Sequence, residues 1–452
     1  MQIKEFLNCI MEQVKYEPIR KEISEELENH LIEAKESYML EGMQEQQAEA
    51  KAIQQMGKAE EIGQKLNQIH RPKLDWKLLM NTIFLMCFGV LVLWIKVTSS
   101  ERIEGMLFRY GVTLVFGIVA SIYIYFLDYQ KVVKNAKYFY GLATILMLFS
   151  VRFGVSFNGI KSWINIGGFS ISVPVLVVPL YILAFIGFLE NMNPHQYFKF
   201  SFSQNKEIKI RKDIFKIIML SVISLGLLLS IPATSSMIVL GIIYLVIATV
   251  KLSELNKNKI KWITALWGIP LLMGILCGII FIEAMPVERL ITSFHPESDP
   301  AGGGWIGINQ KIILNSANAF GEADDMSNSL EMFDEGTNFA FISILAHFGW
   351  IPALAMISVI VTFSIKLMIN AMKIKDMTGK LIIVGISSLF ILQSIFNLLM
   401  NFNVGMKSNF NIPFISYGNS NLLVNMLCLA LVLSVYRKKD LIICTKKRVM
   451  ES

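Results

Sequence analysis

Residues 77–98 read KLLMNTIFLMCFGVLVLWIKVT, and the eighteen residues between Lys77 and Lys96 contain no charged side chain. A helix of about 20 apolar residues crosses the ~30 Å hydrocarbon core of a bilayer. This stretch therefore predicts a transmembrane helix. Nine further apolar runs of similar character follow it, at roughly 107–127, 137–156, 169–189, 213–231, 233–251, 262–283, 337–366, 379–402 and 419–436. We expect an all-α polytopic membrane protein with about ten transmembrane helices.

The composition agrees with a membrane protein and divides the chain in two. Of the 452 residues, 54% are hydrophobic and 17% are charged, whereas soluble domains carry about 25% charged residues. Residues 1–70 hold 8 Lys/Arg and 14 Asp/Glu, and the remainder holds 34 and 21. The acidic start and the basic body predict two separate parts. Cytoplasmic loops that face anionic lipid account for the basic excess, so no nucleic-acid partner is needed.

The distribution of basic residues predicts the orientation in the membrane. Basic clusters follow the second, fourth, sixth, eighth and tenth apolar runs, for example Lys131 and Lys134, or Arg437 and Lys438. Loops rich in Lys and Arg face the cytoplasm. We therefore expect both termini in the cytoplasm of a bacterium, and the acidic loop 284–336 outside the cytoplasmic membrane.

Three domains are expected: residues 1–72, 73–440 and a basic cytoplasmic tail, 441–452. In the first, Ile23, Leu27, Leu31 and Ala34 recur at helical spacing, and Gly42 marks a stop. This pattern fits an acidic helical domain that packs on itself, or one that docks a cytoplasmic partner. The five cysteines contain no CxxC pair, and no disulfide or metal framework is indicated.

Three segments predicted to be external are rich in Gly, aromatic and polar residues. They lie at 158–168, 299–307 and 413–420. Each could simply anchor the membrane edge, because Trp and Tyr gather at that interface. Three such segments on one face favour a shared binding site. The candidate substrate-binding residues are Lys161, Trp163, Trp305, Ser416, Tyr417 and Gly418, together with Asn397 inside a predicted span.

These segments resemble the SEDS family (shape, elongation, division and sporulation), typified by FtsW and RodA. The resemblance rests on Asn158–Gly168, on Pro296-Glu297-x-Asp299-Pro300 with Gly304-Trp305, on Thr337-Asn338-Phe339-x-Phe341, and on Asn397 with Pro413–Gly418. Residues 1–70 resemble HAAS, a helical domain that precedes permease-like membrane proteins. This second resemblance rests on the motifs Glu25-Glu26-Leu27-x-x-His30-Leu31 and Ala52-Ile53-x-x-Met56-Gly57.

The resemblance implies a role in cell shape or cell division. SEDS proteins polymerise lipid II, the lipid-linked peptidoglycan precursor, beside a class B penicillin-binding protein, and a flippase role has been argued. Their TDFxF Asp is held to act as a base or to bind a divalent cation. This chain has Asn338 at that position. The family's QPSE-x-x-K stretch reads Val173–Pro179, and its PDxGT segment reads Pro232–Ser236, so the family's other buried charges are also missing.

Three hypotheses remain open. The first is a divergent peptidoglycan glycosyltransferase in which Asp334 or Glu335, one turn before Asn338, replaces the missing carboxylate. The second is a catalytically silent protein that binds lipid II or acts as a scaffold of the cell-wall machinery. The third is a flippase or transporter of the lipid-linked precursor. Asn338 favours the second hypothesis over the first, because an amide has no useful basicity.

Overall fold

The computed structural model describes all residues except 1, 70–72, 99–102, 158–159, 167–168, 192–203, 232, 256–265, 269–291, 293, 325–336, 405–409 and 440–452. The chain forms two compact units. One comprises Met1–Asp75 with the short segments Lys373–Asp376 and Val435–Ser452. The other, here called the membrane domain, comprises Trp76–Met372 and Met377–Ser434.

The first unit contains four helices, α1 (Ile3–Gln13), α2 (Glu17–Leu40), α3 (Glu45–Met56) and α4 (Ala59–Ile69). Their common core includes Phe6, Ile10 and Leu31, each no more than 2% exposed. The helix stop predicted at Gly42 is confirmed, because this residue has φ +91° and follows the end of α2. A left-handed φ favours Gly, which has no Cβ to clash with the backbone.

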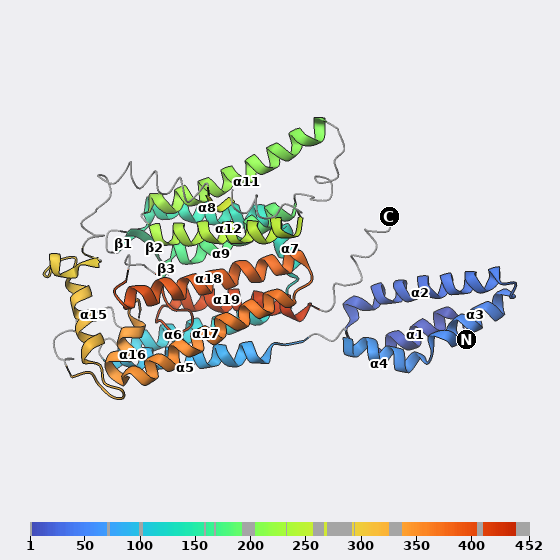
Figure 1. The fold of residues 1–452 in the computed structure, drawn as a ribbon, viewed down its shortest axis with the longest axis horizontal. Coiled ribbons are helices and arrows are strands. Elements are labelled where there is room, and N and C mark those ends of the chain that lie inside the picture. Colours follow the sequence, from blue (N-terminus) through green and yellow to red (C-terminus); the bar gives the residue numbers. More distant parts are fainter. Residues whose placement is uncertain are drawn as a thin grey trace. The chain divides into compact units, whose positions relative to one another are not determined.

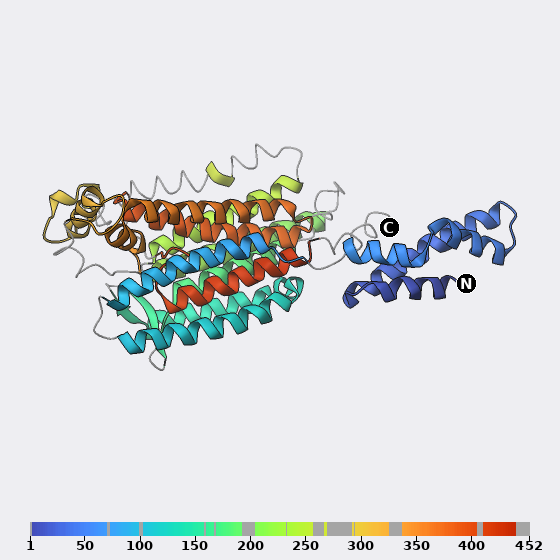
Figure 2. The ribbon, with the colours of Figure 1, turned by 90° about the horizontal axis from the view of Figure 1, so that it is seen from below.

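The membrane domain is a bundle of long apolar helices that run roughly parallel to one another (Figures 1 and 2). Its helices before the loop at 284–336 are α5 (Trp76–Thr98), α6 (Ile103–Phe126), α7 (Tyr129–Lys134), α8 (Ala136–Phe153), α9 (Val173–Glu190), α11 (Gln204–Ser230) and α12 (Thr234–Leu255). Those after its start are η1 (Pro296–Ser298), α15 (Trp305–Ser316), α16 (Ala340–Phe348), α17 (Trp350–Lys373), α18 (Met377–Asn401) and α19 (Asn419–Arg437). Most of α9 and α18 is buried among the other helices.

Seven helices of the described part are long and apolar enough to cross a membrane: α5, α6, α9, α12, α17, α18 and α19. A shorter apolar stretch, Phe215–Ser230, lies within α11. The helical, multi-pass architecture expected from the sequence is thereby confirmed. The predicted span at 262–283 lies almost wholly outside the described residues.

The structure corrects two boundaries. The apolar run 337–366 is not one helix, because α16 ends before Gly349 and α17 begins after it. Gly349 has φ +87°, and a Cβ there would lie 2.6 Å from the Asn318 carbonyl oxygen. Residues 155–172 also form a small antiparallel sheet, β1 (Val155–Phe157), β2 (Ile160–Ile166) and β3 (Phe169–Ser172), so the predicted span at 169–189 starts as a strand.

The sheet, α15 and α16 lie at one end of the membrane domain, here called the sheet end (Figure 1). In β2, Trp163 pairs with Ser172 of β3, the residue that directly precedes α9. The C-terminal end of α5 and the N-terminal end of α19 lie at the same end (Figure 1). All three segments with candidate binding residues therefore converge on the sheet end.

Candidate functional site

A cluster of buried amides occupies the C-terminal end of α18. Asn397 and Asn401 lie one helical turn apart on the same face, and neither side chain is exposed. The Asn397 amide nitrogen Nδ2 donates to the backbone oxygens of Asn338, at 2.9 Å, and of Phe410. The Nδ2 of Asn401 donates to the same Asn338 oxygen at 3.1 Å. Two side-chain amides thus hold the backbone of residue 338.

Asn401 also connects this cluster to α16. Its Oδ1 accepts a hydrogen bond from the backbone N–H of Ile342 at 3.2 Å. The first N–H groups of a helix have no partner within the helix, so Asn401 satisfies one of these donors in the first turn of α16. The Asn338 side chain is half-buried, and it makes no hydrogen bond to the residues that the structure describes.

The motif at 299–307 forms a tight turn that starts α15. Asp299 accepts a hydrogen bond from the Gly303 N–H at 2.6 Å. A Cβ on Gly304 would lie 1.8 Å from the Pro296 oxygen, so only Gly fits there. Trp305 begins α15 and is half-buried. The glycine cluster therefore builds a turn, and the turn sets the position of Trp305.

α15 packs against the end of α18, next to the amide cluster. Gln310 donates through Nε2 to the Met400 oxygen at 3.1 Å. A Cβ on Gly307 would lie 2.8 Å from Oδ1 of Asn403, a residue with φ +56°. These contacts bring the segment 299–310 to the last turn of α18, next to Asn401 of the amide cluster.

The loop 410–418 supplies the third part of the site. The Ser416 side chain is buried, and its Oγ accepts a hydrogen bond from the Ile412 N–H at 3.0 Å. This bond fixes the turn, so Ser416 has a structural role in addition to any contact with a ligand. The loop also packs closely on α5, because a Cβ on Gly89 would lie 2.4 Å from the Phe414 oxygen. Gly418 lies beside the amides of Asn411 and Asn421.

A second cluster, the cationic–aromatic cluster, surrounds Tyr417. The Lys96 ammonium lies 5.5 Å from the centroid of the Tyr417 ring, and the Tyr110 and Tyr417 rings stack with centroids 6.2 Å apart. Burial raises the pKa of the Tyr417 hydroxyl, while the positive charge of Arg109 lowers it. Arg109 is itself held by a bond from Nε to the Gly105 oxygen at 2.8 Å. The cluster presents two cations beside a neutral phenol.

The sheet joins this region through Ser420, at the start of α19. Its Oγ donates to the Ser170 oxygen at 3.1 Å, and it accepts from the Ser172 N–H at 3.3 Å. Trp163 is half-buried in the neighbouring strand β2. The backbone of Lys161 is part of the same strand. Its side chain is not among the described parts of the structure.

Two further predicted residues, Asp334 and Glu335, lie outside the described residues. Sequence reasoning missed Asn401, Gln310, Lys96 and Tyr110. Only Asn401 carried a clear signal, since it follows Asn397 by one turn within an apolar helix.

The described residues do not fit a divalent cation at Asn338. Such ions prefer carboxylate oxygens together with carbonyls and water. The groups that converge here are amides, and their nitrogens occupy the Asn338 carbonyl. No group of three or more His, Cys, Asp or Glu that could hold a metal ion occurs among the described residues.

Comparison with known proteins identifies relatives over most of the chain. It is 22% identical to the peptidoglycan glycosyltransferase RodA of Treponema pallidum, over 80% of this chain and 97% of that one. It is 24% identical to a probable peptidoglycan glycosyltransferase FtsW of Nitrosomonas europaea, over 82% and 94%.

Solved structures share the fold. A chain of a peptidoglycan synthase complex that coordinates polymerization and crosslinking superposes with a TM-score of 0.64, at 21% identity, over 81% of this chain and 98% of that one. The rod shape determining protein RodA of Thermus thermophilus superposes with a TM-score of 0.54, at 18% identity, over 81% and 97%. The sequence profile of the cell cycle proteins FtsW, RodA and SpoVE matches residues 75–441. The chain therefore belongs to the FtsW/RodA/SpoVE family of cell cycle proteins, the SEDS family.

Proposed function

We propose that this protein binds a lipid-linked peptidoglycan precursor, lipid II, at the sheet end and polymerises it slowly or not at all. The observation that carries the proposal is the chemistry of Asn338. Its backbone is held in place by Asn397 and Asn401, yet its side chain is an amide where the family resemblance expects a carboxylate. An amide can hydrogen-bond a sugar, but it cannot accept a proton from a sugar hydroxyl.

The cationic–aromatic cluster supports the binding half of the proposal. Lipid II carries a diphosphate between its sugar and its polyprenyl chain, at the depth where a membrane meets water. Lys96 and Arg109 place two cations beside Tyr417. Lys and Arg are the residues that bind phosphate groups, and Tyr and Trp are enriched at the membrane–water interface.

We propose that the membrane domain is oriented with the sheet end outside the cell. The basic clusters predict that the loops after the even-numbered spans are cytoplasmic. The sheet end then faces the outside, where glycan strands grow. The bacterial cytoplasmic membrane is the location that this orientation requires, with both termini in the cytoplasm.

The partners proposed are those of the family. One relative in structure belongs to a peptidoglycan synthase complex, which supports a class B penicillin-binding protein as the partner of this chain. The domain at residues 1–72 would bind a separate cytoplasmic partner. A scaffold role within such a complex needs lipid II binding and no catalysis, which is the combination that Asn338 predicts.

The test is polymerisation of labelled lipid II by the purified protein, with and without the partner penicillin-binding protein. A positioned general base contributes about 10²–10⁴ in rate. We expect little polymer from the wild type and an increase of that order for Asn338→Asp. Asn315→Asp is the matched control, because it adds the same charge to the exposed side of α15 at the sheet end.

The double variant Asp334→Ala/Glu335→Ala tests the rival hypothesis of an active glycosyltransferase with a relocated carboxylate. Robust polymerisation by the wild type that is lost in this variant would identify a relocated carboxylate. Robust polymerisation that survives it would refute both a silent site and a relocated base. Binding is measured separately: Lys96→Gln together with Arg109→Gln should weaken lipid II affinity, and unchanged affinity would place the substrate elsewhere.

A further inference from the structure

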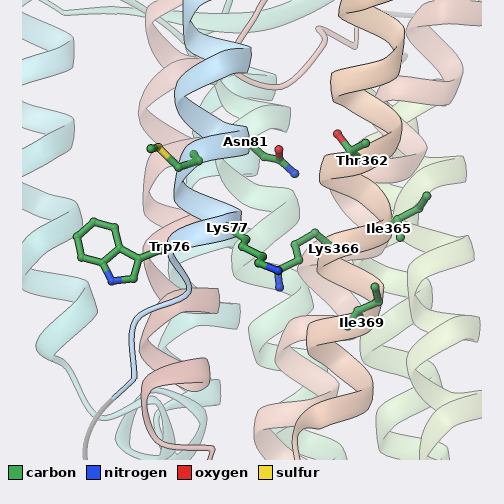
Figure 3. Close-up of a pocket in the computed structure, with 8 residues that line it drawn as sticks. Trp76, Lys77, Asn81, Thr362, Ile365, Lys366 and Ile369 are labelled. Atoms are coloured by element: carbon green, nitrogen blue, oxygen red, sulfur yellow. The ribbon is translucent and has the colours of Figure 1, made fainter.

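A pocket of about 480 Å³ lies between α5 and α17 (Figure 3). These parts of α5 and α17 lie at the end of the membrane domain opposite the sheet (Figure 1). The first turns of α5 provide Trp76, Lys77, Met80 and Asn81, and the last turns of α17 provide Thr362, Ile365, Lys366 and Ile369. The pocket is therefore far along both helices from the Asn338 region and forms no part of the site proposed above.

The polar part of this pocket is positively charged. Lys77 and Lys366, on different helices, extend their side chains toward one another (Figure 3). Asn81 and Thr362 add an amide and a hydroxyl, and no acidic residue is among the residues that line the pocket. An anion placed between the two ammonium groups is attracted by both of them.

The rest of the pocket is apolar and largely exposed. Met80 and Ile365 are 56% and 50% exposed, and Ile369 continues the same face of α17 one turn further on. Trp76 is 70% exposed at the start of α5, and Trp at the end of a span lies at the level of the lipid headgroups. A ligand that fits this pocket combines an anionic group at headgroup depth with a hydrocarbon chain.

We propose that the pocket binds an anionic phospholipid from the leaflet at this end, which the basic loops predict to be the cytoplasmic one. Lys77 and Lys366 hold the phosphate, Asn81 and Thr362 bond the headgroup, and an acyl chain lies along Met80, Ile365 and Ile369. The transmembrane helix of another protein is a poorer occupant, because an apolar helix would cover both ammonium groups and offer them no hydrogen-bond acceptor.

The test measures lipid affinity of the full-length protein in detergent by native mass spectrometry. The probes are phosphatidylglycerol and phosphatidylcholine with identical acyl chains. A basic residue near anionic lipid contributes about a fivefold gain in affinity, so Lys77→Gln/Lys366→Gln should weaken phosphatidylglycerol binding about 25-fold. Phosphatidylcholine binding should change little.

Lys131→Gln/Lys134→Gln is the matched control, since it removes two exposed lysines from α7 at the same end of the domain. Ile369→Glu is a second variant, which keeps both lysines and places a carboxylate in the pocket. We expect the control to retain phosphatidylglycerol and Ile369→Glu to lose it. Equal wild-type affinity for the two lipids, unchanged affinity in the Lys77/Lys366 variant, or an equal loss in the control would each overturn the proposal.

Discussion

The amide cluster leads to a quantitative prediction about Asn397→Ala. The substitution removes the hydrogen bonds that Nδ2 donates to the Asn338 and Phe410 oxygens, and the bond from Asn401 to Oδ1 of Asn397 at 2.9 Å. At about 1 kcal/mol net for each bond, the loss is about 3 kcal/mol. The better helix propensity of Ala returns about 0.6 kcal/mol. We expect a net destabilisation of about 2–3 kcal/mol.

Ser394→Ala is the control for this prediction, because Ser394 lies one turn earlier on α18 and is also buried. Within the described part of the chain, its Oγ bonds only to the Phe390 oxygen of its own helix, at 2.8 Å. That substitution should cost less than about 1 kcal/mol. The assay is thermal unfolding in detergent, followed by tryptophan fluorescence. Each kcal/mol corresponds to about 1–2 °C in a chain of this size, so the melting temperatures should differ by about 2–5 °C. A melting temperature for Asn397→Ala equal to that of Ser394→Ala would refute the stabilising role of the cluster.

Three further predictions concern packing, domain independence and orientation. Gly89→Ala should destabilise the protein by about 1–3 kcal/mol through overpacking against the Phe414 carbonyl, whereas Gly111→Ala, which has open space around it, should be neutral or stabilising in the same thermal assay. A fragment of residues 1–72 should be helical and unfold cooperatively by circular dichroism, and a random-coil spectrum would show that it needs the rest of the chain. A cysteine that replaces the exposed Phe320 should react with an impermeant thiol reagent in intact cells. A cysteine that replaces the exposed Gln130 should react only after the membrane is opened. The reverse labelling pattern would show that the topology is inverted.

The sequence predicted most of the membrane helices, because apolar length alone determines whether a segment can span a bilayer. It could not predict the break at Gly349. Gly adopts positive and negative φ about equally well. The φ of +87° at Gly349 and the close approach of the Asn318 carbonyl, 31 residues earlier in the chain, become visible only in the structure. The strands at 155–172 were hidden for a similar reason. β1 and β3 lie at the ends of the apolar runs 137–156 and 169–189, and β2 lies in the mixed segment between these runs. The pairing of the three strands depends on register rather than on hydropathy.

The candidate site was predictable in part. The aromatic and glycine-rich segments lie together at one end of the domain, as expected for a shared site. Asn397 was recognisable as a polar residue inside a span. The contacts that individual site residues make were harder to predict. Nothing in the local sequence indicates that Ser416 bonds to Ile412, or that Lys96 lies over Tyr417 across more than 300 residues of chain. Such partners are set by how the helices pack, which one sequence does not specify.

The hydrogen bonds to residue 338 have a consequence for how this protein can change over generations. Both bonds end on the backbone oxygen, which every amino acid carries, so the identity of the side chain there is not constrained by the amide cluster. The codons for Asn and Asp differ by a single nucleotide. A lineage could therefore lose or regain an acid at this position in one mutational step while the membrane domain keeps its stability. The fold holds the backbone of residue 338 in place, but its stability does not depend on which side chain that residue carries.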